Sequence, residues 1–244
     1  MQPSSSSANL NQGSSAPRPR AVVCLSGGMD STVCATLAAR DFDVFALHFG
    51  YGQRTEVREL QSARDVARII GAKEFMPLKI DLFRRIGGSA LTDSTIEVPD
   101  APEEESAIGD DVPVTYVPFR NAHFLSAAVS WAEVIGAQTI FIGAVEQDSS
   151  GYPDCRPAYY AAFNELIRLG TKEAAIRVVT PLIAMRKSEI VRLGVELGAP
   201  LHVSWSCYSG QSEACGRCDS CALRLRAFRD AGVTDPIAYV PGVR

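Results

Sequence analysis

The chain has 244 residues, of which 46% are hydrophobic and 21% charged, and its formal net charge at pH 7 is −4. No run approaches the ~20 apolar residues of a membrane span, and the acidic balance argues against a broad nucleic-acid surface. This length fits one globular domain with a sizeable core and a small appendage, and we expect a small-molecule substrate with no membrane or nucleic-acid partner.

The chain is expected to have three parts. Residues 1–19 are rich in serine and proline and contain no apolar stretch that resembles a secretion signal, so we expect a disordered tail and a cytoplasmic location. Residues 20–203 are expected to form the main α/β domain. Residues 204–244, which contain a cluster of cysteines, are expected to form a small C-terminal zinc-binding subdomain.

A short glycine loop follows the first apolar run of the chain. Residues Ser26–Ser31 read Ser-Gly-Gly-Met-Asp-Ser and lie between the apolar run Ala21–Leu25 and the helix-prone run Thr32–Arg40. Two adjacent glycines let the backbone turn sharply and bring its N–H groups close to a ligand, while the polar side chains can cap the helix. The positive end of that helix favours a phosphate, although a tight turn without a ligand is the alternative.

The loop lacks the spacing of the usual P-loop and of the dinucleotide-binding fingerprint. It resembles instead the loop of the ATP pyrophosphatase family, which holds the pyrophosphate portion of ATP while the α-phosphate is attacked. The resemblance implies catalytic roles for Ser26, Asp30 and Ser31. It implies ATP contacts along the whole segment, at Leu25, Ser26, Gly27, Gly28, Met29, Asp30, Ser31, Thr32, Val33, Cys34 and Ala35.

Short apolar runs alternate with amphipathic segments along the chain. The runs that read as strands are Val22–Leu25, Val44–Phe49, Phe75–Ile80, Thr139–Gly143 and Arg177–Val179. Apolar residues at helical spacing lie between these runs. The alternation predicts a doubly wound α/β fold with a parallel five-stranded sheet, and the resemblance implies the adenine nucleotide alpha hydrolase-like variant. Ligands of such folds gather at the carboxyl ends of the strands.

Four cysteines near the C-terminus form the second strong signal. They are Cys207, Cys215, Cys218 and Cys221. Four thiolates can surround one tetrahedral Zn²⁺, and with every position filled by protein such a zinc would be structural. An iron–sulfur cluster is the serious alternative, because four cysteines also hold one. Disulfides are less favoured, since nothing marks the chain as secreted.

Five blocks in the same order resemble the 7-cyano-7-deazaguanine synthase family over residues 20–236. The blocks are Leu25–Thr32, His48–Arg54, Val117–Asn121, Ser150–Arg156 and Ser204–Tyr208, the last with three later cysteines. The resemblance implies a nitrile-forming ligase of queuosine biosynthesis, which converts 7-carboxy-7-deazaguanine, ammonia and ATP into the cyano product. It also implies a structural zinc and a homodimer.

Departures from that family are small. Phe119 stands where the family more often has glycine, and Ser149 stands where tyrosine is common. The spacer between Cys207 and Cys215 is about one residue short of the usual length. The first two departures concern the details of the substrate loops, and the third concerns the shape of the metal loop but not its number of ligands.

The expected chemistry explains why ATP is needed. A carboxylate conjugated to an electron-rich pyrrole is a poor electrophile, so its oxygen must first become a leaving group. Attack on the α-phosphate would give an acyl adenylate, provided that the departing pyrophosphate is neutralised. The loop, Mg²⁺ and Lys187 are expected to do this. Lys187 matches the lysine of many ATP pyrophosphatases, and its alternative role is that of an ordinary first-turn surface lysine.

Substrate residues are expected in two loops near the glycine loop. Asp154 could accept hydrogen bonds from a guanine-like edge, Arg156 could pair with the carboxylate, and Tyr152 could pack on the heterocycle. The alternative is that these three only order a loop. Arg120 and Asn121 are candidates for phosphate or substrate contact.

Other aspects of the function follow from the length and charge of the chain. A glutamine-hydrolysing domain needs on the order of 150 further residues, so free ammonium is the predicted nitrogen source.

A tRNA-thiolating ATP pyrophosphatase is the alternative enzyme. The acidic balance and the lack of an appended RNA-binding segment argue against it. A non-enzymatic zinc module is a further alternative, which leaves the glycine loop unexplained.

Overall fold

A five-stranded parallel sheet forms the centre of the protein. The computed structural model describes residues 17–102, 112–146 and 151–242, and the strand order is β3-β2-β1-β4-β5. The strands are β1 Arg20–Cys24, β2 Asp43–Gly50, β3 Glu74–Lys79, β4 Thr139–Ile142 and β5 Arg177–Val179. All five predicted strands are confirmed within two residues of their expected ends, and so is the doubly wound α/β fold class.

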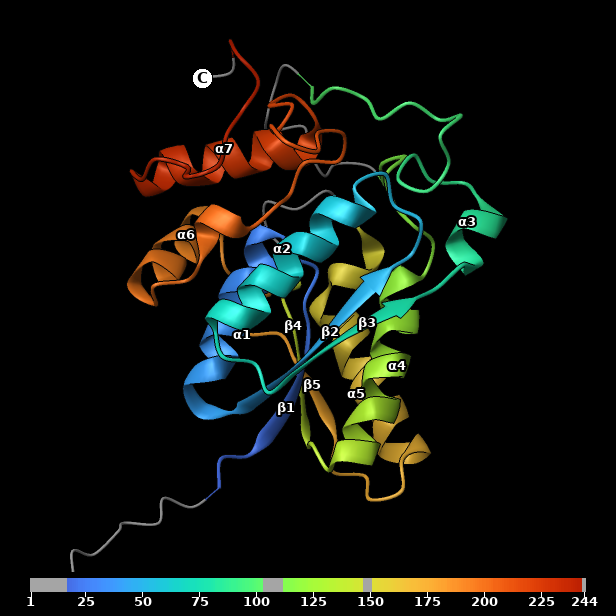
Figure 1. Ribbon diagram of the computed structural model, residues 1–244. Helices are drawn as coiled ribbons and strands as arrows, with labels where there is room; N and C mark the ends of the chain where they lie inside the picture. Colours follow the sequence, from blue (N-terminus) through green and yellow to red (C-terminus); the bar gives the residue numbers. More distant parts are fainter. Residues whose placement is uncertain (1–16, 103–111, 147–150, 243–244) are drawn as a thin grey trace, which may run out of the picture.

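Helices cover both faces of this sheet. Within the described ranges they are α1 Met29–Asp41, α2 Glu56–Ile69, α3 Leu82–Ile86, α4 Arg120–Ile135, α5 Pro157–Gly170, α6 Lys187–Glu196 and α7 Asp219–Ala231, with short 3-10 turns η2 Pro153–Cys155 and η3 Leu201–Val203. Helices α1, α2 and α6 lie on one face, and α4 and α5 lie on the other (Figure 1). Among the described residues no helix has both the length and the apolar character needed to cross a membrane.

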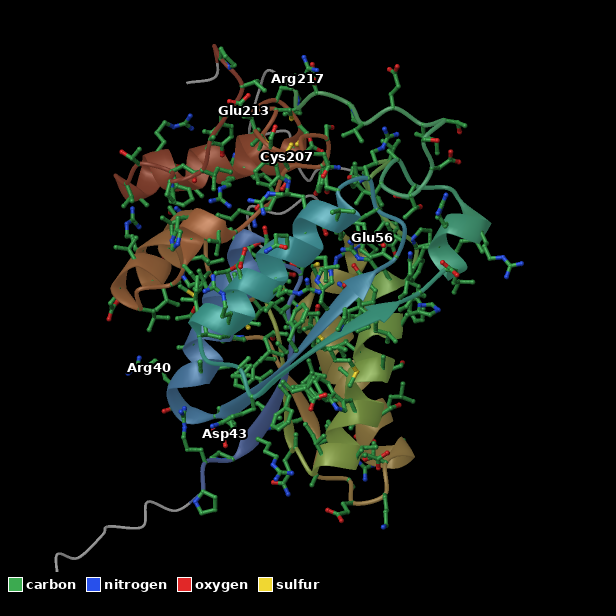
Figure 2. All side chains as sticks on the ribbon, viewed as in Figure 1. Arg40, Asp43, Glu56, Cys207, Glu213 and Arg217 are labelled. Carbon is green, nitrogen blue, oxygen red and sulfur yellow. The ribbon has the colours of Figure 1, made fainter. Side chains whose placement is uncertain are left out.

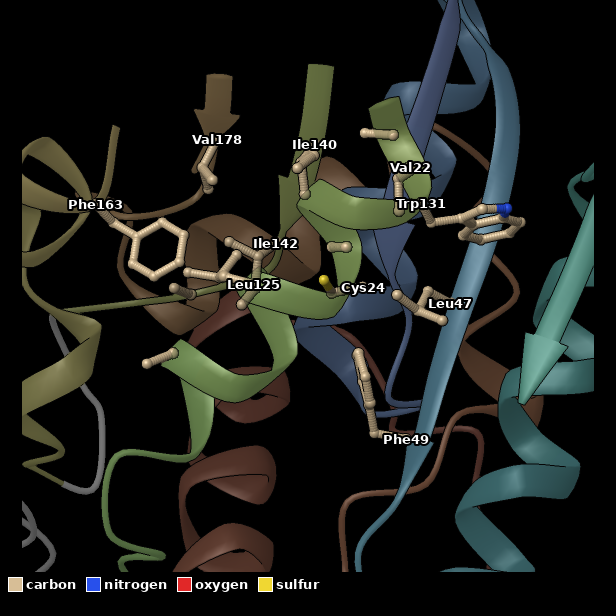
Figure 3. Packing of buried hydrophobic residues seen from close by; sticks show 14 of the residues in the cluster. Val22, Cys24, Leu47, Phe49, Leu125, Trp131, Ile140, Ile142, Phe163 and Val178 are labelled. Atoms are coloured by element: carbon tan, nitrogen blue, oxygen red, sulfur yellow. The ribbon is translucent and has the colours of Figure 1, made fainter. Parts of the chain in front are cut away.

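The two hydrophobic cores follow from the alternation of side chains along β1. Ala21 and Val23 join the cluster that includes α1 and α6, whereas Val22 and Cys24 point to the opposite side and pack with Leu125 of α4 (Figure 3). Since the central strands are buried on both faces, their residues are apolar in nearly every position. This arrangement leaves the loops at the strand ends to form a functional site.

The connections diverge at the carboxyl end of β1. Cys24 of β1 pairs with Leu47 of β2 on one side and with Ile142 of β4 on the other. The chain leaves β1 toward β2 and β3, and it later returns on the other side for β4 and β5. Such a topological switch point creates a crevice outside the strand ends, where ligands of this fold class bind.

The C-terminal segment covers that end of the sheet. Helix α7 lies beside α6, and its Phe228 belongs to the same core cluster as Ile190 of α6 (Figure 1). The cysteines have a small cluster of their own, and Arg217 beside them accepts a hydrogen bond on its carbonyl from the Ala101 N–H at 2.7 Å (Figure 2). The division of the chain at residue 203 stays a prediction.

Some expectations fall outside the described residues. They concern residues 1–16 of the predicted tail, Ser149, Ser150 at the start of the fourth block, and residues 243–244 of the predicted C-terminal subdomain.

Candidate active site

The glycine loop is a close-packed turn whose first glycine is required. Gly27 has a φ of +87°, and a Cβ placed there would lie 2.7 Å from the Ala63 nitrogen of α2. Ser31 closes the turn, because its Oγ accepts from the Gly27 N–H at 3.2 Å and donates to the Gly28 carbonyl at 3.0 Å. Gly28 is the N-cap of α1 and has no side chain, and the cap predicted from Ser26, Asp30 or Ser31 is absent; the Met29 N–H of the first turn donates instead to the Oγ of the distant Ser206 at 3.4 Å. The positive helix end therefore faces the crevice.

Asp30 and Lys187 meet at this helix end. The Lys187 Nζ donates to the Asp30 Oδ2 at 2.7 Å, with side chains that are 12% and 25% exposed respectively. A Cβ placed at Gly143, which follows β4, would lie 2.8 Å from the Asp30 carbonyl oxygen, so glycine lets β4 end directly against α1. The second oxygen of Asp30, Oδ1, is buried and has no hydrogen-bond partner within the described ranges.

Two adjoining cavities open at the carboxyl ends of the strands, with volumes of about 270 and about 190 Å³. The predicted site residues that line the larger one are Leu25, Ser26, Gly28, Met29, Asp30, Ser31, Arg120, Asn121 and Tyr152. Lys187 lines the smaller one, which shares Asp30, Arg120 and Tyr152 with its neighbour. The glycine loop and the candidate substrate residues thus face a common space.

Other predicted residues line neither cavity. Thr32, Val33, Cys34 and Ala35 are fully buried in α1 and pack into the core. Gly27 contributes to the turn beneath the cavity. Arg156 is exposed at the N-cap of α5, and Asp154 is buried below the start of α4. Roles of these residues in ligand contact stay predictions.

Arg120 brings a positive charge into the larger cavity. Its Nη1 donates to the Tyr51 hydroxyl at 2.9 Å, and its guanidinium lies 5.3 Å from the Tyr51 ring centre and 5.8 Å from that of Tyr152. Its Nε is buried and has no hydrogen-bond partner among the described residues. A buried guanidinium with an unused N–H is suited to an anionic ligand.

Asp154 holds the start of α4, where Arg120 lies. Its Oδ2 accepts from the Asn121 N–H at 3.2 Å, and its carbonyl accepts from the Asn121 Nδ2 at 3.2 Å. Burial raises the pKa of Asp154, and the nearby charge of Arg120 partly opposes this. The neighbouring Cys155 lines both cavities, and burial raises its pKa to about 11, so it is a protonated thiol at neutral pH.

Phe119, which directly precedes α4, is one of the departures noted in the sequence. It has a φ of +56°, in the left-handed region where glycine carries no steric penalty. A glycine at this position, common in the resembling family, would therefore adopt the same turn without strain.

Sequence reasoning assigned no role to several residues of the cavity wall. Glu59 of α2 accepts from the Thr55 hydroxyl at 2.7 Å and from the Gln53 Nε2 at 3.0 Å. All three line the larger cavity, and burial raises the pKa of Glu59. Trp205 and Ser206 line it from the C-terminal segment. Gln53, Trp205 and Ser206 belong to the blocks His48–Arg54 and Ser204–Tyr208, which carry the family resemblance and could have indicated these three residues.

The four C-terminal cysteines form a group that could hold a metal ion. The Sγ atoms of Cys207, Cys215, Cys218 and Cys221 all lie within 4.8 Å of one another, and the Cys215–Cys221 pair is 3.9 Å apart. All four are free thiols. The Cys207 Sγ accepts backbone hydrogen bonds from Gly210 at 3.0 Å and Cys215 at 3.3 Å. Such N–H donors stabilise a thiolate.

Comparisons with known proteins converge on one family. The family model for "Queuosine biosynthesis protein QueC" matches residues 20–232. The chain is 72% identical over 222 residues to a 7-cyano-7-deazaguanine synthase of Acidobacterium capsulatum, which covers 91% of this chain and 97% of that protein. It is 61% identical to a protein of the same name from Koribacter versatilis, over 91% of this chain and 94% of that protein. The tRNA-thiolating and non-enzymatic alternatives are not favoured by these relatives.

Two solved structures share a more distant likeness. One is an NH3-dependent NAD synthetase from Campylobacter jejuni, with 17% identity and a TM-score of 0.44 over 77% of this chain and 68% of that chain. The other is an NMN synthetase from Francisella tularensis, with 15% identity and a TM-score of 0.45 over 93% of this chain and 90% of that chain.

Proposed function

The chain belongs to the QueC family of queuosine biosynthesis proteins, and from this premise we propose that it is an ATP-dependent ligase. Its substrates are 7-carboxy-7-deazaguanine and ammonia, and its product is 7-cyano-7-deazaguanine. The observation that carries the proposal is the shared cavity, in which the glycine loop and Arg120 face each other. A nucleotide held at the glycine loop and an anionic heterocycle held at Arg120 would therefore face the same space.

The reaction proceeds in two activations. The substrate carboxylate attacks the α-phosphorus of ATP, the bond to the bridging oxygen breaks, and pyrophosphate leaves. Ammonia attacks the acyl carbon, AMP leaves, and a proton passes to solvent, which gives an amide. The amide oxygen then attacks a second ATP with loss of pyrophosphate. Departure of that oxygen with AMP, and of both protons from nitrogen, forms the nitrile.

The groups around Asp30 support the phosphate side of this chemistry. The N-terminal end of α1 and the Lys187 ammonium lie together, and both stabilise negative charge that grows on a departing pyrophosphate. The unpaired Asp30 Oδ1 is a suitable ligand for the Mg²⁺ that accompanies ATP and neutralises its phosphates. Asp30 thus has one oxygen for the lysine and one for a cation.

Arg120 is the residue that we assign to the substrate carboxylate. It lies in the larger cavity with an unused Nε–H, whereas Arg156 is exposed and lines neither cavity. Tyr152 lies 5.8 Å from its guanidinium carbon and offers an aromatic face to the heterocycle. Asn121 and Asp154 then act on the substrate through the position of Arg120.

We also propose that the four cysteines hold one structural Zn²⁺. A tetrahedral ion with Zn–S bonds of about 2.3 Å places its sulfur atoms about 3.8 Å apart. The 3.9 Å between Cys215 and Cys221, and the 4.8 Å limit for the whole group, agree with a single ion. A cluster of several irons would hold its thiolates farther apart. Metal analysis of anaerobically purified protein should therefore find zinc, and a brown protein with iron would contradict this.

The proposed activity can be tested directly. Purified protein is incubated with 7-carboxy-7-deazaguanine, ¹⁵N-ammonium and Mg-ATP, and the products are analysed by mass spectrometry. We expect the nitrile with one ¹⁵N atom, together with AMP and pyrophosphate. Glutamine without ammonium should give no turnover. Unchanged 7-carboxy-7-deazaguanine under all conditions would refute the proposal.

Asp30→Asn, which removes the charge that pairs with Lys187, should abolish this turnover, and Asp43→Asn is a suitable active control for it. Asp43 forms an exposed pair with Lys73 at 3.6 Å and lies at the start of β2, at the opposite end of the sheet from the cavity.

The homodimer and the cytoplasmic location are further proposals. Light scattering of the purified protein tests the first, and cell fractionation tests the second.

A further inference from the structure

Residues 204–206 lie against the glycine loop. They lead directly into the metal loop, the segment 207–221 that contains the four cysteines. The Trp205 N–H donates to the Gly27 carbonyl at 2.7 Å, and the Met29 N–H donates to the Ser206 Oγ at 3.4 Å. A Cβ placed at Gly28 would lie 3.9 Å from the same Ser206 Oγ. Ser206 therefore lies directly over the turn, although it is 177 residues away from Met29 in the sequence.

Arg224 of α7 holds this segment from behind. Its side chain is 1% exposed and pairs with Asp235, with Nε and Nη2 at 2.7 and 2.9 Å from the two carboxylate oxygens. Nη1 donates to the Ser204 Oγ at 2.9 Å and to the Ser206 Oγ at 3.5 Å, and Nη2 also donates to the Leu201 carbonyl at 3.3 Å. All five N–H donors of the guanidinium are thus used within the protein.

The bonds to Ser206 fix the direction of its own hydrogen. A serine hydroxyl has one hydrogen to donate and two lone pairs that accept. Met29 N–H and Arg224 Nη1 are both donors, so they occupy the lone pairs and leave the hydrogen unused. Within the part of the chain that the structure describes, no acceptor is found for this hydrogen, and Ser206 lines both cavities. The free hydrogen therefore points toward a ligand.

We propose that Ser206 donates this hydrogen bond to the phosphate chain of the nucleotide, and that Arg224 is the residue that positions it. The inference rests on the proposed binding of ATP at the glycine loop. A phosphate oxygen is an acceptor without hydrogens, and it is already expected at the glycine loop, which Ser206 overlies. The serine thus extends the phosphate site beyond the glycine loop and joins that site to the metal loop, since Cys207 follows directly.

Arg224 also lines the smaller cavity, but its side chain is only 1% exposed, and we assign its effect on the ligand to Ser206. Its five donors are engaged, and its charge is compensated by Asp235, which also accepts from the Tyr239 hydroxyl at 2.7 Å. Tyr239 packs against the cysteine cluster and is bridged to Ala214. Contacts therefore connect the metal loop through Tyr239 and Asp235 to Arg224, and Arg224 in turn holds Ser206 beside the glycine loop.

Pyrophosphate binding to the zinc-loaded full chain tests the proposal. In calorimetric titrations with Mg-pyrophosphate, Ser206→Ala should weaken binding about 10-fold, because a hydrogen bond to a charged group is lost. Ser206→Thr keeps the hydroxyl and should keep the affinity. Zinc content and melting temperature should remain those of the parent protein in both variants.

Ser204→Ala is the matched control. Ser204 also contacts Arg224, but its hydroxyl donates to the Leu201 carbonyl at 2.7 Å and it lines neither cavity. The Ser204→Ala protein should bind Mg-pyrophosphate with unchanged affinity even if its stability falls. An unchanged affinity of Ser206→Ala, or an equal loss in Ser204→Ala, would overturn the role of Ser206. If the parent protein binds neither Mg-pyrophosphate nor Mg-ATP, the proposed nucleotide site fails, and the inference fails with it.

Discussion

Lys187 and Asp30 form an ion pair of 2.7 Å although 157 residues separate them in the sequence. Each residue lies at the start of a helix, Asp30 in the first turn of α1 and Lys187 at the first position of α6. A lysine at a helix N-terminus is unfavourably placed in the field of the helix dipole. Its pairing with Asp30 compensates for this and holds an ammonium group beside the glycine loop.

We predict that Lys187→Met lowers kcat by about 10²–10³-fold, because a positive charge opposite the developing pyrophosphate is lost. The melting temperature should change little, since the pair is partly exposed. The double variant Asp30→Asn/Lys187→Met should lose less activity than the product of the two single losses, because the residues act as a unit. Lys73→Met, in an exposed pair away from the cavity, is the control. Full activity of Lys187→Met in a steady-state assay would contradict the assignment.

The fold could be predicted because its signals are local. The five strands are short apolar runs between turn residues, and the sheet that buries them on both faces makes nearly every position apolar. The glycine loop is also a local signal, because the two adjacent glycines stand in the sequence where the turn needs a positive φ, which is +87° at Gly27. Five of the residues Ser26–Ser31 line the larger cavity as expected, and Gly27 supports the turn beneath it.

The walls of the cavity could not be predicted in the same way. Ser206 and Glu59 reach it from separate segments, and only the packing of α2 and α7 brings these segments to the glycine loop. The sequence also does not tell which neighbouring side chains of one loop point inward. Tyr152 lines the cavity, the Asp154 carboxylate bonds to the start of α4, and Arg156 is exposed. The short turn η2 is the reason, because it rotates successive residues to different sides.

We predict that Cys218→Ser lowers both zinc content and stability, because a closed site loses one of four ligands and with it part of the folding energy. Zinc per chain by elemental analysis and the melting temperature should fall together. Cys34→Ala is the control, since Cys34 is buried in α1 and remote from the four cysteines in the sequence and core. That variant should lose some stability and keep its zinc. A Cys218→Ser protein with full zinc and an unchanged melting temperature would contradict the four-cysteine assignment.

We predict that His48 makes the protein less stable in mild acid. Its Nδ1 carries a hydrogen and donates to the Leu25 carbonyl at 2.9 Å, and its Nε2 is buried without a partner among the described residues. Burial lowers the pKa of His48 from its ordinary value of 6.5, and the Leu25 carbonyl partly opposes this. Below pH 6.5 the unfolded chain therefore binds more protons than the folded one, and stability falls as the pH drops toward the lowered pKa.

The pH dependence of urea unfolding measures this effect. One proton corresponds to a slope of at most about 1.4 kcal/mol per pH unit. His48→Asn can still donate to the Leu25 carbonyl and does not titrate, so its free energy of unfolding should fall less than that of the parent between pH 7 and pH 5. The exposed His202→Asn should follow the parent. Parallel curves for the parent and His48→Asn would show that His48 does not contribute.

We predict that Gly27→Ala damages both stability and nucleotide binding, whereas Gly71→Ala affects stability alone. Both glycines have positive φ, +87° and +71°, so each alanine adds backbone strain of about 1–3 kcal/mol. They differ in their surroundings, since a Cβ at Gly27 would lie 2.7 Å from the Ala63 nitrogen and a Cβ at Gly71 would meet nothing within 4 Å. Urea unfolding and calorimetric titration with Mg-ATP should therefore give the larger loss of stability, and the only loss of ATP affinity, for Gly27→Ala. Equal behaviour of the two variants would mean that the close approach of the loop to α2 does not shape the phosphate site.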